Sequence, residues 1–406
     1  MFYQLIKTCK YFVLYCIITS FLSANNAISL SLSSKENSLF WNEINNFGIN
    51  GSNQLLLSSK FNYGDKSSFH LGVQSKISHT SFSNTYIEYQ INEKNLLKAG
   101  KYYRDFSNYL NDNLSSGSML ISRNSEALPK VGYVGHNSLK HNNVYFRYGL
   151  AHAQFDKNKN YSRPPFLHEK FLYIFLSRND YSFGLGLVHE AIWGGTTNFG
   201  KQPATFEDFF RIFRASHGDE DANIGDQINA LGNHLGIWDF IFNKKIDSES
   251  EIKFYYQHIF EDDSGFKFKN KNDGLWGIEI VLKDTNLLFE YLDTSHQSGY
   301  NTIIGNDSYY NHNIYNEGWS YRGNTLGNPF ITHKKNIPVQ LTHFGFAKEF
   351  NFLNISFLFT EKTPASKSNL FLLSIDKQFS NVYFGFGLGN SIDNKISLKS
   401  SFTLGF

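Results

Sequence analysis

The sequence predicts an all-β protein, a transmembrane antiparallel β-barrel of about 18 strands with long extracellular loops. Three observations lead to this prediction. The chain begins with a segment typical of exported proteins, and beyond it apolar and polar residues alternate with a period of two. Aromatic residues make up 17% of the 406 residues, chiefly as 40 Phe and 24 Tyr, and barrels place many rings at both membrane interfaces.

The segment 1–24 is expected to be a signal peptide cleaved near Ala24. Lys7 and Lys10 supply the positive start, 11–22 is an apolar run, and small residues follow it. The run is too short to serve as a membrane anchor.

Both cysteines, Cys9 and Cys16, lie in this leader, so the mature chain is expected to lack disulfides and thiolate sites. Beyond it no apolar run approaches the ~18 residues of a membrane helix, so if the exported chain sits in a membrane it must do so as a closed barrel. We therefore expect the outer membrane of a Gram-negative cell. The net charge of +2 offers no electrostatic case for nucleic acid as a partner.

The domain prediction places a short periplasmic N-terminal segment at 25–53, with a short helix at 39–46, and the barrel at 54–406. The last strand, 395–406, shows the alternation most clearly, with Ile396, Leu398 and Phe402 on one face and Lys, Ser, Thr or Gly between them. Apolar residues facing lipid and polar residues facing the lumen produce this pattern.

The alternative is a large β-sandwich, whose apolar faces point inward. The predicted strands are 54–63, 68–79, 82–91, 96–104, 119–123, 130–136, 143–155, 169–177, 182–191, 234–243, 249–261, 275–283, 287–296, 338–349, 353–361, 369–378, 381–389 and 395–406.

Loop lengths follow this order of strands with one exception. If the N-terminus is periplasmic, loops after odd-numbered strands are extracellular and longer. The two long insertions, 192–233 and 297–337, follow odd-numbered strands, and the short turn 350–352 follows an even one. The stretch 105–118 breaks the rule.

Function in a barrel concentrates in long loops and in the lumen. The long insertions combine aromatic rings, which stack on sugar rings, with amides and charged groups that bond hydroxyls. The alternative interpretation, which composition alone favours, is that these rings fold the loops into the barrel mouth as a lid. The predicted polysaccharide-binding residues are Trp193, Tyr309, Tyr310, His312, Tyr315, Trp319, Tyr321 and Arg322.

A second set of polar residues is expected to line the lumen: Arg147, Glu190, Asp239 and Glu279. A polar lumen would also suit a diffusion channel, but polar lumens are common to barrels generally.

Signals for catalysis are weak, and we predict neither catalytic residues nor a cofactor. His189-Glu190 lacks the second His of a zinc helix, and no G-x-S-x-G elbow is present. The acidic stretches 219–226 and 261–263 could hold a cation, but their spacing fits no calcium-binding loop, so no metal is predicted.

Several motifs resemble the Wzi family of capsule assembly proteins. They are the run 189–195, the segments 206–210 and 232–236 with Asp239, and the sequence from Tyr309 to Leu326-Gly327. The similarity keeps the motif order from about 55 to 406, although only 25–53 stands where family members have a sizeable helical region. Residues 102–106 also replace a Trp-Trp-Gly-Pro-Gly-like run of the family.

The resemblance implies an 18-stranded barrel whose loops close the mouth, and a non-enzymatic, lectin-like role in holding capsular polysaccharide or exopolysaccharide at the cell surface. Other expected partners are outer-membrane lipid and polysaccharide export machinery, with the barrel itself a monomer. On this view Trp319→Ala or Arg322→Ala should weaken polysaccharide binding and leave folding intact.

Overall fold

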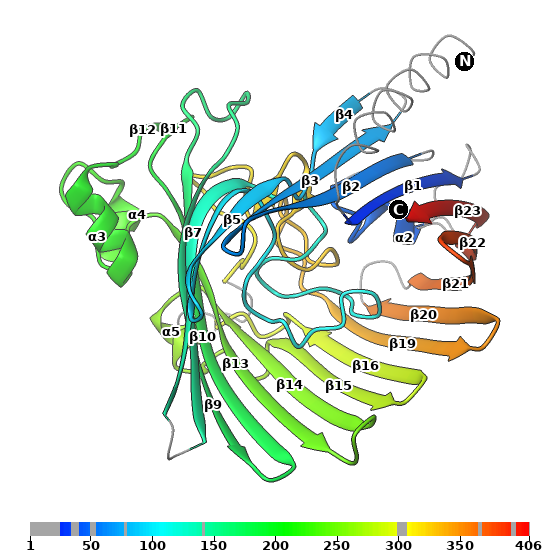
Figure 1. Cartoon of the computed structure of the whole chain (residues 1–406). Helices are drawn as coiled ribbons and strands as arrows, with labels where there is room; N and C mark the ends of the chain where they lie inside the picture. The colour runs from blue at the N-terminus through cyan, green and yellow to red at the C-terminus, as the bar shows by residue number, and fades with distance from the viewer. Residues whose placement is uncertain are drawn as a thin grey trace.

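A computed structural model describes residues 25–33, 40–48, 54–76, 79–139, 143–298, 307–363, 368–390 and 395–405. The predicted signal peptide lies outside these residues. The main sheet is antiparallel and closes on itself, because β1 pairs with β2 on one side and with β23 on the other. β4 and β5 both pair with β3 as two pieces of one interrupted strand, so the barrel has 18 strands. The predicted fold class is confirmed (Figure 1).

The strands and helices of the described residues have the following bounds: β1 (Asn25–Ser33), α2 (Phe40–Glu43), β2 (Gln54–Tyr63), β3 (Ser67–Lys76), β4 (His79–Phe82), β5 (Tyr86–Asn92), β6 (Asn95–Lys101), β7 (Pro129–Leu139), β8 (Val144–Gln154), β9 (Phe166–Arg178), β10 (Tyr181–Trp193), β11 (Thr196–Thr197), β12 (Gly200–Lys201), α3 (Phe206–Arg214), α4 (Ile224–Ile228), β13 (Asn233–Lys245), β14 (Glu251–Phe260), α5 (Asp263–Phe266), β15 (Gly274–Leu282), β16 (Thr285–Asp293), β17 (Ser320–Tyr321), β18 (Asn324–Thr325), β19 (Gln340–Phe350), β20 (Leu353–Thr363), β21 (Ser368–Phe379), β22 (Val382–Asn390) and β23 (Ile396–Gly405). None of the described helices is long and apolar enough to cross a membrane.

Alternation along each strand separates a lipid-facing from a lumen-facing set of side chains. On β13, Phe240 is exposed on the outer face, while Asp239 and Ile241 are buried on the inner face. The same division holds on β14, where Phe254 is exposed outside and Tyr255 is buried inside. Period-two alternation therefore allows each strand to place its apolar side chains toward lipid and its other side chains toward the lumen.

The predicted start of the barrel at Gln54 is wrong. Residues 25–33, assigned to a periplasmic segment, form β1 and close the barrel. Leu30 faces lipid opposite Leu55 and Phe402, and Ser29 faces inward, where the Thr403 hydroxyl donates to it at 2.8 Å. The short helix expected within 39–46 is present as α2.

The predicted strand at 119–123 is also wrong, because this stretch crosses the lumen without joining the sheet. The two errors cancel in the total number of strands. They change only the numbering of the strands that precede residue 119, each of which moves up by one. With β1 as the first strand, the segment 102–128 follows the fifth strand, and all the long loops leave the same end of the barrel. The exception at 105–118 thereby disappears. The long-loop end is the extracellular end, and the short turns lie at the periplasmic end.

Candidate functional site

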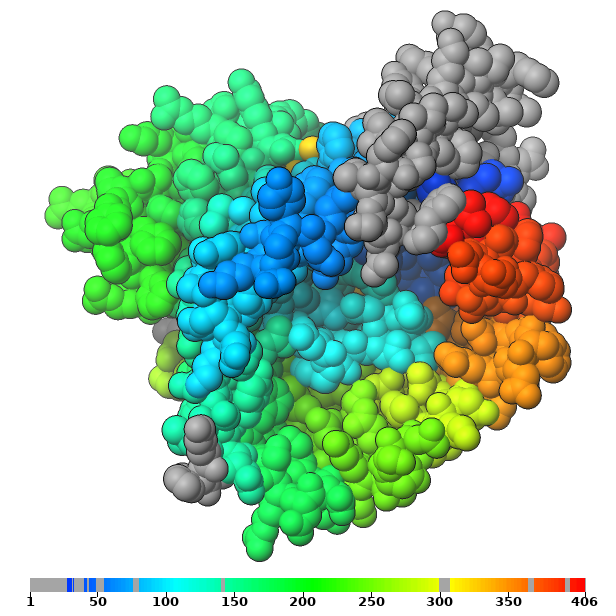
Figure 2. Space-filling model, in the orientation of Figure 1, coloured from blue at the N-terminus to red at the C-terminus, as the bar shows by residue number. Residues whose placement is uncertain are grey.

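The segment 102–128, here called the plug, runs from β6 through the barrel lumen to β7. Its side chains Leu114, Met119 and Leu120 are buried in one apolar cluster with lumen-facing residues such as Leu275 and Leu292. Figure 1 shows the cyan trace of the plug inside the ring of strands, and in Figure 2 cyan atoms occupy the middle of the face. The plug therefore fills space that an open channel would leave to water.

Carboxylates that point from the wall into the lumen bind the plug. The Tyr109 hydroxyl donates to both oxygens of Asp239, at 2.5 and 2.6 Å, and the Asn111 amide donates to Glu279 at 2.9 Å. Both carboxylates are buried, and a buried charge is tolerated only when such bonds replace water. Two residues predicted to line a polar lumen thus anchor the plug instead.

Neighbouring strands continue this set of contacts. Glu290 on β16 accepts hydrogen bonds from the Ser115 hydroxyl at 2.6 Å and from the Ser116 backbone N–H at 2.7 Å. Gln257 on β14 accepts from the Met119 backbone N–H at 2.9 Å. Hydrogen bonds to charged groups contribute about 1.5–3 kcal/mol each, so the plug is firmly attached along this side of the wall.

The segment 307–337, here called the cap, packs on the plug from the extracellular side. The Tyr310 hydroxyl donates to the Met119 carbonyl at 2.5 Å and accepts from the Asn328 backbone N–H at 2.8 Å. The Trp319 indole N–H donates to the Leu120 carbonyl at 2.8 Å. The plug and the cap are thus one folded unit inside the barrel mouth.

Other cap rings reach neighbouring extracellular loops. The Tyr309 hydroxyl donates to Asp273 at 2.5 Å, at the start of β15. The Tyr315 hydroxyl donates to the Gly194 carbonyl at 3.3 Å, just after β10. These bonds fasten the cap to the wall on both sides.

Arg322 and His312 are the polar members of the predicted site. Arg322 is exposed and pairs with Asp156 at 2.6 Å and with Glu126 of the plug at 2.7 Å, while the Tyr321 hydroxyl donates to the same Asp156 at 3.0 Å. His312 accepts hydrogen bonds at Nδ1 from two backbone N–H groups, at 3.2 and 3.3 Å. Burial lowers the pKa of His312 to about 4, so the ring is neutral at pH 7.

The structure brings the predicted cap residues together, but most of their rings have no open face. Tyr310 and Tyr315 are each 1% exposed and Trp319 is 0% exposed. A ring that stacks on a sugar needs one face free. In this conformation the rings hold a lid in the barrel mouth, as the alternative interpretation proposed.

A comparison with protein families gives one match, in which the family model of capsule assembly protein Wzi covers residues 22–352. The chain belongs to the Wzi family. Membership assigns the protein a role in capsule assembly at the Gram-negative outer membrane, and together with the barrel fold it indicates a non-enzymatic protein.

Two other comparisons add little. No curated protein matches the sequence. Among solved structures, two mutants of a porin from Rhodopseudomonas blastica match with TM-scores of 0.40 and 0.41, at 9% and 10% identity. Each match covers 95% of this chain and 99% of the porin. At these scores the likeness carries no argument about this Wzi-family chain.

Trp193 lies apart from the other predicted site residues of the Wzi-family barrel. It ends β10 on the outer face of the wall, 5% exposed, in a cluster with Ile212 and Leu231. The Phe209 ring of α3 packs on it at 5.9 Å between ring centroids. Its partners come from 205–232, which sequence patterning alone does not place outside the wall.

Arg147 and Glu190 face the lumen, as does Asp239. Arg147 lies over the Phe171 ring at 5.9 Å. Glu190 is 0% exposed, and neither carboxylate oxygen has a hydrogen-bond partner among the described residues. Its cross-strand neighbour Glu169 pairs with Lys130 at 2.7 Å.

The exposed extracellular surface carries groups that the sequence analysis did not select. Between the cap and the loop 155–165, the Asn160 amide donates to Glu317 at 2.6 Å, so the two segments share one outer face. The sequence signal for this face is the group of Lys and Arg residues in short, polar loop stretches. The sequence analysis did not use it, because it selected aromatic residues as the binding site. The exposed residues of this face include Lys157, Lys159, Arg163, Asn313, Asn316, Arg322, Lys334 and Lys335.

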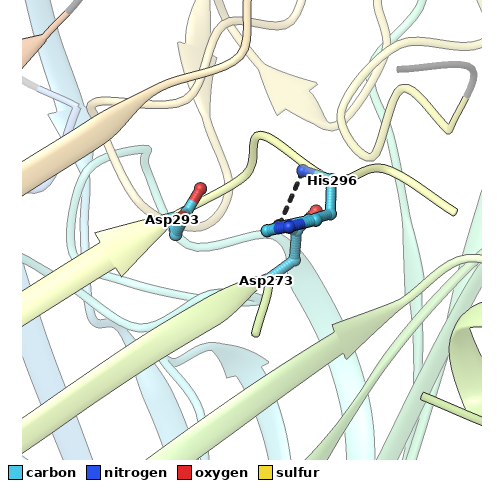
Figure 3. Close-up of side chains that lie close together, drawn as sticks. All are labelled: Asp273, Asp293 and His296. Carbon is cyan, nitrogen blue, oxygen red and sulfur yellow. Dashed lines mark hydrogen bonds and ion pairs between the residues drawn. The ribbon is translucent and has the colours of Figure 1, made fainter. Parts of the chain in front are cut away.

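Asp273, Asp293 and His296 form a group whose ligand atoms lie within 4.8 Å of one another (Figure 3). The Asp273 carboxylate accepts from the backbone N–H groups of His296 and Gln297, at 3.0 and 2.7 Å, and from Tyr309. Burial raises the pKa of Asp273, and these donors oppose the rise. Because the carboxylate is already satisfied by the chain, we assign it to holding the cap and not to a cation.

Proposed function

We propose that this Wzi-family barrel is a closed, lectin-like protein that binds and organises capsular polysaccharide or exopolysaccharide at the cell surface. The observation that carries the proposal is the occupied lumen: the plug and the cap lie inside it, and the plug is held by wall residues such as Asp239, Glu279 and Glu290. Among the described residues, we assign the ligand outside the cell to the outer face of the cap and of the loop 155–165.

The chemistry of this face suits a polysaccharide that carries negative charge. Its exposed cations attract anionic polymers, and its exposed amides can bond sugar hydroxyls. Arg322 is the predicted site residue that lies on this face, with its guanidinium held by two carboxylates. We assign it a direct contact, and we assign Tyr309, Tyr310, Tyr315, Trp319 and Tyr321 to supporting the face from below.

The deciding experiment is binding of the purified, detergent-folded protein to surface polysaccharide from its own source, against an unrelated neutral glycan. We expect selective binding that Lys334→Ser/Lys335→Ser and Arg322→Ala each weaken. The matched control is Lys66→Ser/Lys94→Ser, which removes two lysines from the periplasmic turns 64–66 and 93–94. Equal binding by the parent and the cap variants, with all proteins folded, would remove the assignment.

The competing function is a diffusion channel, and it predicts a different electrical behaviour. A barrel filled by the plug should pass little current in a planar bilayer. Sustained single-channel conductance of the unmodified protein would favour the channel.

A further inference from the structure

Two extracellular segments turn outward and cover the outside of the wall instead of its mouth. One is 205–232, with α3 and α4, and the other is 261–273, with α5. Figure 1 places α3 and α4 outside the ring of strands, and the same residues form the green lobe at the left of Figure 2. Their positions put them beside the outer leaflet of the membrane.

α3 lies on β9 with an apolar edge turned to the membrane. Its Phe209 ring packs on His168 at 5.4 Å, and its Phe213 ring packs on Lys170 at 4.2 Å, so the helix is fastened to the outer face of the strand. Phe206, Phe210 and Phe213 fall on one side of the helix and are 78%, 43% and 40% exposed.

The edge of α3 next to these rings is charged. Arg211 pairs with Glu207 at 2.9 Å, and Arg214 is exposed in the last turn. A short helix with one aromatic and one charged edge is typical of segments that lie in the plane of a membrane interface. The next outward residue on β9 below Lys170 is the exposed Leu172, where the lipid-facing belt begins.

The segment 261–273 repeats this arrangement on the neighbouring strands. Phe266 packs on Trp238 at 5.0 Å, and Phe268 packs on His258 at 4.1 Å, both on the outer wall. Phe266 and Phe268 remain exposed. The Trp276 indole N–H donates to the Asn272 carbonyl at 3.3 Å, so the segment is tied to the ring below it.

A groove of about 710 Å³ lies in the outer wall below these segments. It crosses the outer faces of β9 to β16, and its lining is almost entirely apolar and aromatic. Trp276 and Tyr256, which stack at 3.7 Å, lie at its upper part, and the Tyr256 hydroxyl donates to the Asp273 carbonyl at 3.2 Å. The groove therefore begins where the segment 261–273 ends.

Lysines stand above the groove on the same segment. Lys267 pairs with Asp263 at 2.5 Å, whereas Lys269 and Lys271 are exposed and form no ion pair with other described residues. The Lys271 carbonyl also lies within 3.4 Å of the Tyr256 hydroxyl. Cations directly above an apolar groove match a ligand with an anionic head and hydrocarbon tails.

We propose that this surface binds an outer-leaflet lipid whose headgroup bears phosphate and has a net negative charge. The acyl chains lie in the groove, Lys269 and Lys271 contact the phosphate, and the exposed Phe side chains of α3 and of 261–273 enter the boundary between headgroups and chains. The lining of the groove identifies the occupant as lipid, since it includes the exposed lipid-facing rings Phe183, Phe254 and Phe289 of the wall. The charge of the headgroup follows from the two lysines.

Tryptophan quenching by brominated lipid tests the proposal in the full-length protein. Trp238 and Trp276 lie on the outer wall by the groove, whereas Trp41, Trp193 and Trp319 are buried. The protein is reconstituted in phosphatidylcholine vesicles that contain a small, equal fraction of brominated phosphatidylglycerol or brominated phosphatidylcholine. We expect stronger quenching by the brominated phosphatidylglycerol, and a loss of this excess in Lys269→Ser/Lys271→Ser.

Two controls make the result decisive. Trp276→Phe should remove most of the excess quenching, which places the lipid at the groove, and Lys66→Ser/Lys94→Ser should keep it. The proposal is overturned if both brominated lipids quench equally, or if the excess survives in Lys269→Ser/Lys271→Ser. It is also overturned if Trp276 is shielded from lipid because a second copy of the chain covers the groove, as cross-linking would reveal.

Discussion

Asp239 is fully buried in the lumen and accepts hydrogen bonds from the hydroxyls of Tyr109 and Tyr173, the second at 2.7 Å. Tyrosines and carboxylates at such positions are the residue types that a sugar-binding site also uses. Composition therefore predicts that polar and aromatic residues gather in the barrel mouth, and it cannot decide whether they face a ligand or each other. In this structure the Tyr310 hydroxyl and the Trp319 indole bond to the plug, and the Tyr309 hydroxyl bonds to Asp273. A role of these rings in polysaccharide binding stays a prediction.

Replacing Trp319 tests the role of the cap rings. Since the side chain is 0% exposed and bonded to the plug, Trp319→Ala should cost the cap about 3–5 kcal/mol of local stability, contrary to the initial expectation that folding stays intact. Hydrogen exchange and limited proteolysis of 307–337 would measure the loss, while the barrel itself stays heat-modifiable on a gel. Arg322→Ala, which removes partly exposed ion pairs, should cost only about 1 kcal/mol. Equal protection of the cap in parent and Trp319→Ala would contradict the packing described.

His312 should make the cap sensitive to acid. Its pKa is lowered from 6.5 to about 4 in the folded cap, so the unfolded segment binds the proton more readily. The contribution to stability is complete above pH 6.5 and is lost as the pH falls to about 4, amounting to at most about 3 kcal/mol.

The comparison variant is His312→Asn, whose side-chain oxygen can accept the same backbone N–H groups without titrating. Burial raises the pKa of Asp307 in the same segment to about 6, so protonation of Asp307 stabilises the folded cap as the pH falls. This effect opposes that of His312 and is the same in the parent and in His312→Asn. The difference in hydrogen exchange of 307–337 between parent and variant should therefore appear below pH 6.5. A pH profile unchanged by His312→Asn would count against a role for this ring.

At the scale of single elements, the strands of the wall were predictable because each has one face in lipid, which imposes alternation on the sequence. β1 carried the same signal, with Ile28, Leu30 and Leu32 between small polar residues, but its place next to the signal peptide led to a periplasmic assignment. Within 119–123, Met119, Leu120 and Ile121 are apolar because they are buried on all sides within the plug. In the sequence such a run looks like a strand. Short apolar runs do not distinguish a strand from a buried loop.

β1 should be essential for closing the barrel, because it bonds to β2 and β23 at once. Leu30→Pro removes a backbone N–H in the middle of the strand and should leave the β1 edge open. We expect loss of the heat-modifiable band on a gel run without boiling. Leu30→Ala keeps the backbone N–H and shortens only a lipid-facing side chain, so it should retain the band. A folded, heat-modifiable Leu30→Pro barrel would show that closure does not depend on β1.

For the whole molecule, the extracellular loops take two directions, and each direction serves a different surface. The plug and the cap turn inward and close the lumen, while 205–232 and 261–273 turn outward over the wall. The inward loops leave a charged face toward the outside of the cell, and the outward loops leave an aromatic face toward the membrane. A Wzi-family barrel built in this way presents a charged extracellular surface and an aromatic, membrane-facing surface side by side on one wall.

Removing the plug should convert the closed barrel into a conducting one. Replacement of 105–126 by a short Gly-Ser linker takes away the groups bonded to Asp239, Glu279 and Glu290, and these wall carboxylates can then be hydrated in an open lumen. In planar bilayers we expect discrete current steps that the parent lacks, with a preference for cations because the freed groups are acidic. Heat-modifiability would show that the wall still folds, since its strands pair with one another and not with the plug. A folded barrel that stays silent without the plug would mean that the cap alone seals the mouth, and the closure would have to be reassigned to it.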